Sequence, residues 1–179
     1  MTRTVVLPQE LSDRLDKLVM AKEEINGCLF YRRKQDFCPL EYLFATGIGT
    51  EGHVQSAPER IHVVNEFLNI NPEYNFVKFH THSTGTIKEY GDYYAMNFSQ
   101  GDLAEFKSQF KDNPEYIALL ATPKTKLLCG LDNPQLEIVS DFKGFTQRQV
   151  DLHDSLQKIA ERLGYPLYAL QAKIIQSQK

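Results

Sequence analysis

Two of the five histidines, His80 and His82, are separated by one residue at the end of an apolar segment. That segment, residues 76–81, predicts a strand, and side chains two positions apart on a strand point to the same face. Both imidazoles could therefore bind one metal ion. Zinc accepts histidine nitrogen and, in catalytic sites, usually takes a third protein ligand and a water molecule. The pair alone is equally typical of two polar side chains that face solvent where a strand ends.

A third ligand is available in a short motif, Ser99-Gln100-Gly101-Asp102, that precedes a predicted helix. Its first and last residues occupy the positions of a capping box, with Ser99 at the N-cap and Asp102 three residues later. Taken by itself, the motif indicates helix capping. Capping and metal binding are nevertheless compatible, because the first turn of a helix presents its side chains at an exposed end.

Glu24 directly precedes an apolar strand candidate, residues 25–31. A carboxylate at the entrance of such a strand is unusual, because glutamate side chains are mostly exposed. Burial beside a metal-bound water would give this carboxylate the raised basicity that a general base needs. Glu23, in contrast, is typical of a charge at the end of a helix.

Three fragments follow one another along the chain: Glu24-x-x-Gly27, His80-x-His82 and Ser99-x-x-Asp102. Together they resemble the signature of the JAMM (MPN+) metalloproteases, and the order of the expected elements is similar over residues 3–140. The resemblance implies a zinc-dependent metalloprotease or isopeptidase. Its reaction would be hydrolysis of the amide or isopeptide bond after the C-terminal glycine of ubiquitin or a ubiquitin-like modifier, and conjugates of that modifier would be its partners.

The resemblance also implies a role for each residue. Zinc would be bound by His80, His82 and Asp102, with a water molecule as the fourth ligand. Glu24 would take a proton from this water and pass it to the leaving amine. Ser99 would donate a hydrogen bond to the oxygen that becomes negatively charged during the reaction.

Two features depart from the pattern of the family. Ser83 stands directly after the second histidine, where the family usually has proline, and the segment 83–98 is longer than usual. We expect this segment to be irregular, and it contains three tyrosines, Tyr90, Tyr93 and Tyr94. Such a segment could be a lid, a specificity element or an autoinhibitory element, or it could pack on its own domain. Substrate contacts are expected here and in residues 47–56.

Two other functions stay open. The string His80-Thr81-His82-Ser83 also resembles the opening motif of PHP-type metal-dependent phosphoesterases, although only one histidine, His153, follows it to supply further ligands. The second alternative is a catalytically silent MPN scaffold protein. Relatives of that kind have generally lost ligands that this sequence retains.

Hydrophobic periodicity predicts the elements that must position these residues. Helices are expected at residues 11–19, 56–68, from 99 onward and at 145–163. Strands are expected at residues 25–31, 40–48, 76–81, 116–122, 127–131 and 136–139. Strands interleaved with helices predict a mixed α/β fold. The resemblance adds a single MPN/JAB-like domain at residues 1–143, with a central, mostly antiparallel sheet flanked by helices, and a helical extension packed on it at 144–179.

Composition narrows the class of protein. The chain has 179 residues and a formal net charge of -3, which provides no basic surface for nucleic acid. We expect no membrane helix and no secretory signal, and the three unpaired cysteines fit a reduced compartment, so a cytoplasmic protein is expected. The apolar stripe at residues 145–163 is more typical of a helix covering its own sheet than of a partner surface, and a homo-oligomer or a larger complex stays open.

Overall fold

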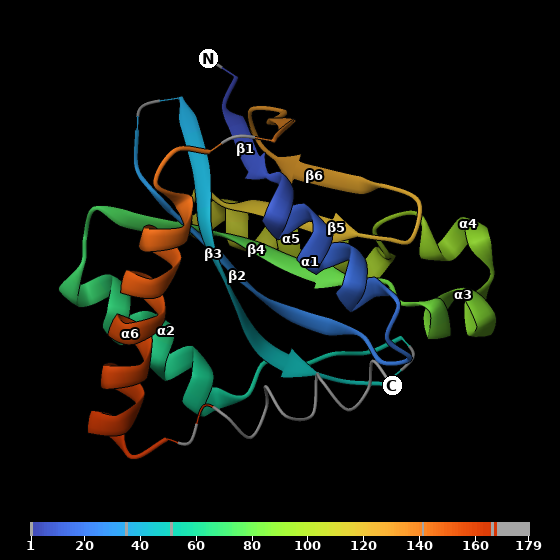
Figure 1. Ribbon diagram of the computed structural model, residues 1–179. Helices are drawn as coiled ribbons and strands as arrows, with labels where there is room; N and C mark the ends of the chain where they lie inside the picture. Colours follow the sequence, from blue (N-terminus) through green and yellow to red (C-terminus); the bar gives the residue numbers. More distant parts are fainter. Residues whose placement is uncertain (1, 35, 51, 141, 166, 168–179) are drawn as a thin grey trace.

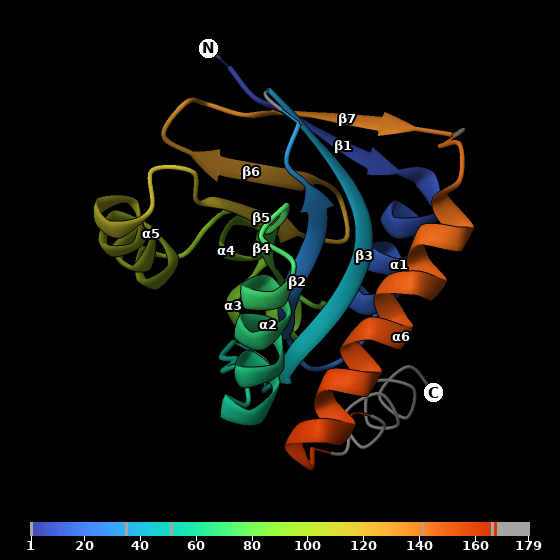
Figure 2. The same ribbon diagram turned by 90° about the vertical axis from the view of Figure 1, so that its left-hand side faces the viewer.

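Seven strands form one mixed sheet in the order β6-β5-β4-β2-β3-β1-β7 (Figures 1 and 2). The computed structural model describes residues 2–34, 36–50, 52–140, 142–165 and 167. The strands are β1 (Thr4–Pro8), β2 (Ile25–Arg32), β3 (Phe37–Ile48), β4 (Tyr74–Thr81), β5 (Ile117–Ala121), β6 (Lys126–Gly130) and β7 (Gln135–Val139). The helices are α1 (Gln9–Val19), α2 (Pro58–Ile70), α3 (Thr84–Tyr90), α4 (Asp92–Ala95), α5 (Gln100–Asp112) and α6 (Phe145–Leu163).

The central strand β2 forms the two longest ladders of the sheet, and both are antiparallel: one with β3 and one with β4. The pairs β1–β3, β1–β7 and β4–β5 are parallel, and β5–β6 is antiparallel. The edge strands β6 and β7 also approach each other, so the sheet is strongly curled (Figure 2). The predicted mixed α/β class, with a mainly antiparallel sheet and flanking helices, is confirmed.

Helices cover both faces of the sheet because the side chains of β2 alternate between two apolar clusters. Leu29 packs with Leu11 and Leu15 of α1 on one face. Phe30 packs on the other face with Phe67 of α2 and with Leu156 of α6. The core is therefore continuous through β2, and this strand is held rigidly where it begins, next to Glu24.

The apolar stripe of α6 faces its own domain. Leu152, Leu156 and Ile159 are buried against α2 and β3, as expected for a helix that covers its own sheet. In the helical extension predicted at 144–179, residues 166 and 168–179 lie outside the described residues. No helix in the described part of the chain is long and apolar enough to cross a lipid bilayer.

Two parts of the fold differ from the prediction. The sequence analysis missed β1, a short strand that ends directly at the first residue of α1. It also predicted an irregular segment at 83–98, which is wrong because this segment contains α3 and α4. Both helices are short, and α3 contains Gly85, so periodicity could not reveal them. A capping box at Ser83 stabilises α3, whereas α4 has no side-chain cap and is held by contacts such as that of the buried Ala95 with His82.

Candidate metal centre

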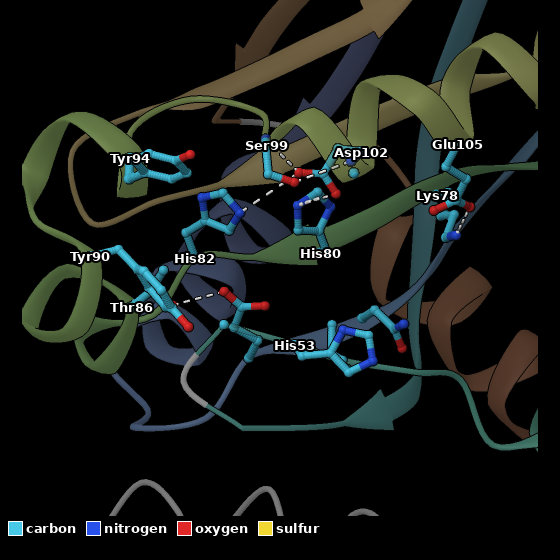
Figure 3. A pocket seen from close by; sticks show the side chains of 15 residues that line it. His53, Lys78, His80, His82, Thr86, Tyr90, Tyr94, Ser99, Asp102 and Glu105 are labelled. Carbon is cyan, nitrogen blue, oxygen red and sulfur yellow. Dashed lines mark hydrogen bonds and ion pairs between the residues drawn. The ribbon is translucent and has the colours of Figure 1, made fainter.

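Strand β4 places both histidines on one side of the sheet. His80 pairs with Asn26 of β2 and with Leu120 of β5, and the amide of His82 donates to the carbonyl of Ala121 at 3.0 Å. Thr81, between them, points the opposite way and accepts a hydrogen bond from the amide of Ile25 at 2.9 Å. The two imidazole rings consequently lie 5.1 Å apart, facing the same pocket (Figure 3).

The N-terminus of α5 brings Asp102 to these rings. Ser99 is the N-cap, and its side-chain oxygen accepts from the amide of Asp102 at 3.1 Å. In return, Asp102 Oδ2 accepts from the amide of Ser99 at 2.7 Å, so the predicted capping box is present. The same Asp102 carboxylate points toward both histidines, which shows that capping leaves it free to serve as a ligand (Figure 3).

The three side chains form a group that could hold a metal ion. The distances are 3.4 Å from His80 Nε2 to Asp102 Oδ1 and 3.9 Å from His82 Nε2 to Asp102 Oδ2. One ligand atom from each residue lies within 4.8 Å of the others. His80 Nε2 is buried and has no hydrogen-bond partner among the described residues, as expected of an atom that needs an ion. Two imidazole nitrogens and one carboxylate are a donor set that suits zinc.

The backbone of α4 determines which nitrogen of His82 faces the group. His82 Nδ1 lies 3.1 Å from the carbonyl oxygen of Ala95, which can only accept, so Nδ1 carries the hydrogen. Burial and the neighbouring His80 lower the pKa of His82, although the Ala95 carbonyl and Asp102 oppose the shift. The ring is therefore neutral at pH 7, with the lone pair of Nε2 directed toward Asp102 and available to a metal.

The charge state of Asp102 is also suited to a cation. Burial alone would raise the pKa of this carboxyl group. Its interactions with His80 and its hydrogen bonds with Ser99 outweigh burial and hold the pKa well below its usual range. Asp102 is thus a carboxylate at neutral pH.

Glu24 lies at the entrance of β2, where the sequence predicted a buried carboxylate. Its side chain is only 4% exposed, and its backbone is paired with the 49–54 segment through Gly49 and Thr50. Burial raises the pKa of Glu24, and a 2.8 Å hydrogen bond from the hydroxyl group of Thr86 partly offsets this effect. A carboxylate with raised basicity therefore faces the same pocket as the two histidines.

The pocket has a volume of about 440 Å³, which is within the range of small-molecule and peptide sites. Gly52, His53 and Val54 line one side, so the expected 47–56 segment does reach it. The remaining lining residues come from β2, β4 and α5, from residues directly beside these elements, and from the α3–α4 segment: Glu24, Asn26, Lys78, His80, His82, Thr86, Tyr90, Tyr94, Ser99, Gly101, Asp102 and Glu105. Both polar and aromatic groups thus surround the histidines.

One end of the pocket is aromatic and the other is charged (Figure 3). Tyr90 and Tyr94 lie at one end, with ring centroids 6.3 Å apart, and Tyr90 packs directly over Gly52. Lys78 and Glu105 form an ion pair at the other end. The sequence analysis named the tyrosines of the 83–98 segment but missed Lys78, although it follows the same alternation as His80.

Thr86 was the main residue that the sequence analysis missed. Ser83-x-x-Thr86 forms a capping box, the same kind of motif that was recognised at Ser99-x-x-Asp102. The sequence analysis named Ser83 for two other reasons: it replaces the proline of the JAMM pattern, and it ends the string that resembles PHP-type phosphoesterases. The spacing of two hydroxyl residues directly after the second histidine was therefore a usable signal for α3.

No family model matches the chain, and no curated protein matches it. Among solved structures, it is similar to the solution structure of protein DSY2949 from Desulfitobacterium hafniense. The two chains are 16% identical, the match covers 78% of this chain and 96% of that chain, and the TM-score is 0.49. A similarity of this strength carries no argument about the family or the activity of the present protein.

Proposed function

We propose that this protein is a zinc-dependent hydrolase of the JAMM type, which cleaves the amide or isopeptide bond after the C-terminal glycine of ubiquitin or a ubiquitin-like modifier. The observation that carries the proposal is the convergence of His80, His82 and Asp102 on one point, with the buried Glu24 in the same pocket. These four residues come from three separate parts of the chain. A purely structural origin would not require all of them to face one cavity.

Each residue has a chemical task that its surroundings support. Zinc held by the two histidines and Asp102 would supply a Lewis acid that makes a water molecule acidic near neutral pH. Glu24, buried and more basic than an ordinary glutamate, accepts the proton and later returns it to the leaving amine. Ser99 Oγ already accepts from an amide, so its hydrogen is free to donate to the substrate carbonyl oxygen.

A small reacting residue suits the proposed site, because His80, His82 and Tyr90 all line the pocket. The candidate metal centre lies between the 49–54 segment on one side and the N-terminus of α5 on the other (Figure 3). Glycine has no side chain to collide with the histidines or with Tyr90, so an extended Gly-Gly tail can approach closely. Backbone hydrogen bonds to such a tail would contribute much of its affinity.

The test combines metal content with hydrolysis. We expect about one zinc per purified, tag-free chain, and cleavage of a Gly-Gly amide conjugate by the zinc-loaded protein. Glu24→Gln is the matched variant, because it preserves the shape of the side chain and should retain zinc while losing turnover. Near wild-type hydrolysis by Glu24→Gln would exclude the proposed base.

Other metal contents would point to the alternatives. Two or three metal ions per chain would favour a phosphoesterase with a polynuclear centre. A protein that binds no zinc even when zinc is offered would be better described as a scaffold.

A further inference from the structure

Four hydrogen bonds join Ser83 and Thr86, at the start of α3, to each other, to Lys22 and to Glu24, the residue proposed as the base. Ser83 Oγ donates to the carbonyl of Lys22 at 2.7 Å and accepts from the amide of Thr86 at 3.3 Å. The amide of Ser83 donates to Thr86 Oγ1 at 3.0 Å. Thr86 Oγ1 in turn donates to Glu24 Oε1 at 2.8 Å. Ser83, Thr86 and Glu24 are all buried, so water competes little with the three bonds among them.

The directions of these bonds follow from the chemistry of the partners. A carbonyl oxygen can only accept, so the single hydroxyl hydrogen of Ser83 is committed to Lys22. The hydrogen of Thr86 is then left for Glu24, because Thr86 Oγ1 already accepts from the amide of Ser83. Glu24 Oε1 thus accepts the hydrogen bond of Thr86, and Oε2 is the oxygen that remains to accept a proton in the proposed reaction.

Ser83 has a function in this arrangement that proline could not perform. Proline has no amide hydrogen and would leave Thr86 Oγ1 without its donor. It would also remove the hydroxyl group that contacts Lys22. The departure of this chain from the JAMM pattern at position 83 is therefore explained by the hydrogen bonds of α3.

We propose that Thr86 is a positioning residue for Glu24, and that formation of α3 is coupled to the orientation of the proposed base. The same hydroxyl group closes the capping box of α3 and holds the carboxylate of Glu24. If α3 unfolds, Glu24 loses its fixed rotamer, and α3 is disfavoured when Glu24 turns away. The description of Glu24 as a base rests on the proposed function. The coupling of α3 to Glu24 does not, because it follows from the hydrogen bonds of Thr86.

Besides Thr86, three ionisable side chains act on the charge of Glu24, each from a different part of the fold. His80 of β4 and His53 of the 49–54 segment favour its ionised form, whereas Asp102 of α5 opposes ionisation. The Thr86 hydrogen bond favours the ionised form because it is donated to a carboxylate oxygen. Removal of this bond should therefore raise the pKa of Glu24 while the other three groups stay in place.

The first experiment follows the side-chain carboxyl carbon of Glu24 by NMR during a pH titration of the zinc-free protein. In Thr86→Val we expect the midpoint to move to higher pH, and in Thr86→Ser we expect it to return to the wild-type value. Thr122→Val is the matched control, because Thr122 is also buried but lies outside α3 and donates to the carbonyl of Thr125. An unchanged midpoint in Thr86→Val, or an equal shift in Thr122→Val, would overturn the proposal.

A measurement on the wild-type chain covers the case in which Thr86→Val does not fold. A buried, hydrogen-bonded hydroxyl proton exchanges slowly, so the proton of Thr86 should be visible and should titrate with Glu24. If the chemical shift of the Thr86 hydroxyl proton does not change as Glu24 titrates, the coupling is refuted.

Activity provides an independent readout in the zinc-loaded protein. Thr86→Val should lower kcat by about 10–100-fold with little change in KM, as is typical when a supporting residue is lost, and Thr86→Ser should restore it. The acidic limb of the pH profile should move upward together with the NMR midpoint. If the titration behaves as expected but no variant hydrolyses a Gly-Gly conjugate, the proposed function fails and the role of Thr86 stands.

Discussion

Substitution of Asp102 by asparagine separates its two roles. The carboxylate caps α5 by accepting from the amide of Ser99 at 2.7 Å, and it lies 3.4 and 3.9 Å from the two histidines. An asparagine side-chain oxygen can still accept from Ser99, so the helix keeps its cap. The negative charge is lost, and with it the anionic ligand of the proposed metal centre. Asp102→Asn should therefore impair zinc binding far more than it impairs folding.

The magnitude can be worked out from linkage. Zinc at 100 times its dissociation constant stabilises the folded wild-type protein by about 2.7 kcal/mol. For a chain of this size, that corresponds to a rise in Tm of about 5–11 °C. If loss of the charged ligand weakens zinc binding by about 100-fold, the same concentration stabilises the variant by only about 0.4 kcal/mol, or about 1 °C. The difference is readily measured.

The assay is thermal unfolding with and without zinc at pH 7, with the zinc concentration fixed from a calorimetric titration of the wild-type protein. Asp102→Ala is the companion variant, because it removes both the ligand and the cap and should cost about 1 kcal/mol more in the absence of zinc. Equal zinc-induced rises in Tm for wild type and Asp102→Asn would show that Asp102 is not a ligand. A large loss of stability in zinc-free Asp102→Asn would show that the charge stabilises the fold through Ser99 or His80, and that the two roles of Asp102 are not separable by this substitution.

Three further expectations concern the site and the fold. Ser99→Ala should reduce the hydrolysis rate by about 10²–10³-fold through loss of a donor to the carbonyl oxygen, and steady-state rates within about threefold of wild type would remove Ser99 from the mechanism. Asp132 accepts two 2.7 Å bonds from the guanidinium of Arg3, which lower its pKa to about 2. Its contribution to stability, about 1–3 kcal/mol, is complete above the unfolded pKa of about 3.9 and is lost as pH falls toward 2. Urea unfolding should show that Asp132→Asn lacks this contribution at pH 7, and a variant as stable as wild type there would contradict the argument. Gly27→Ala should destabilise the fold by several kcal/mol, about 3 or more, because its Cβ would lie 2.2 Å from a backbone oxygen of β3. An unchanged Tm would show that the two strands separate easily.

Local patterns predicted where the candidate residues lie, because these residues stand in regular elements or directly beside them. Alternation along β4 was enough to place His80 and His82 on one face. The capping box was enough to place Asp102 at the exposed start of α5. What remained hidden was the distance between these elements, because the contact of α5 with β4 depends on packing over Phe98 and Phe106.

The rest of the fold could not be predicted because it depends on distant partners. β1 has only five residues, and it is held by parallel pairing with β3 and β7, which lie far along the chain. α3 contains a glycine and lacks an apolar stripe, and it is stabilised by hydrogen bonds from Ser83 and Thr84 to carbonyls of residues 20–22. Such stabilisation leaves no periodic signal in the sequence.

The position of β1 between β3 and β7 has a consequence for synthesis of the protein. β1 precedes both of its neighbours in the chain, and its second neighbour comes from residues 135–139, where Gln135 pairs with Thr4. During translation β1 is therefore an exposed edge strand, and the Phe30–Phe67 cluster lacks its cover of α6. Contacts so distant in sequence slow folding and prolong the time in which an incomplete sheet can pair with other chains. A nascent chain that stops before residue 135 should consequently be sensitive to proteolysis and prone to aggregation, whereas synthesis of residues 135–163 supplies both β7 and α6.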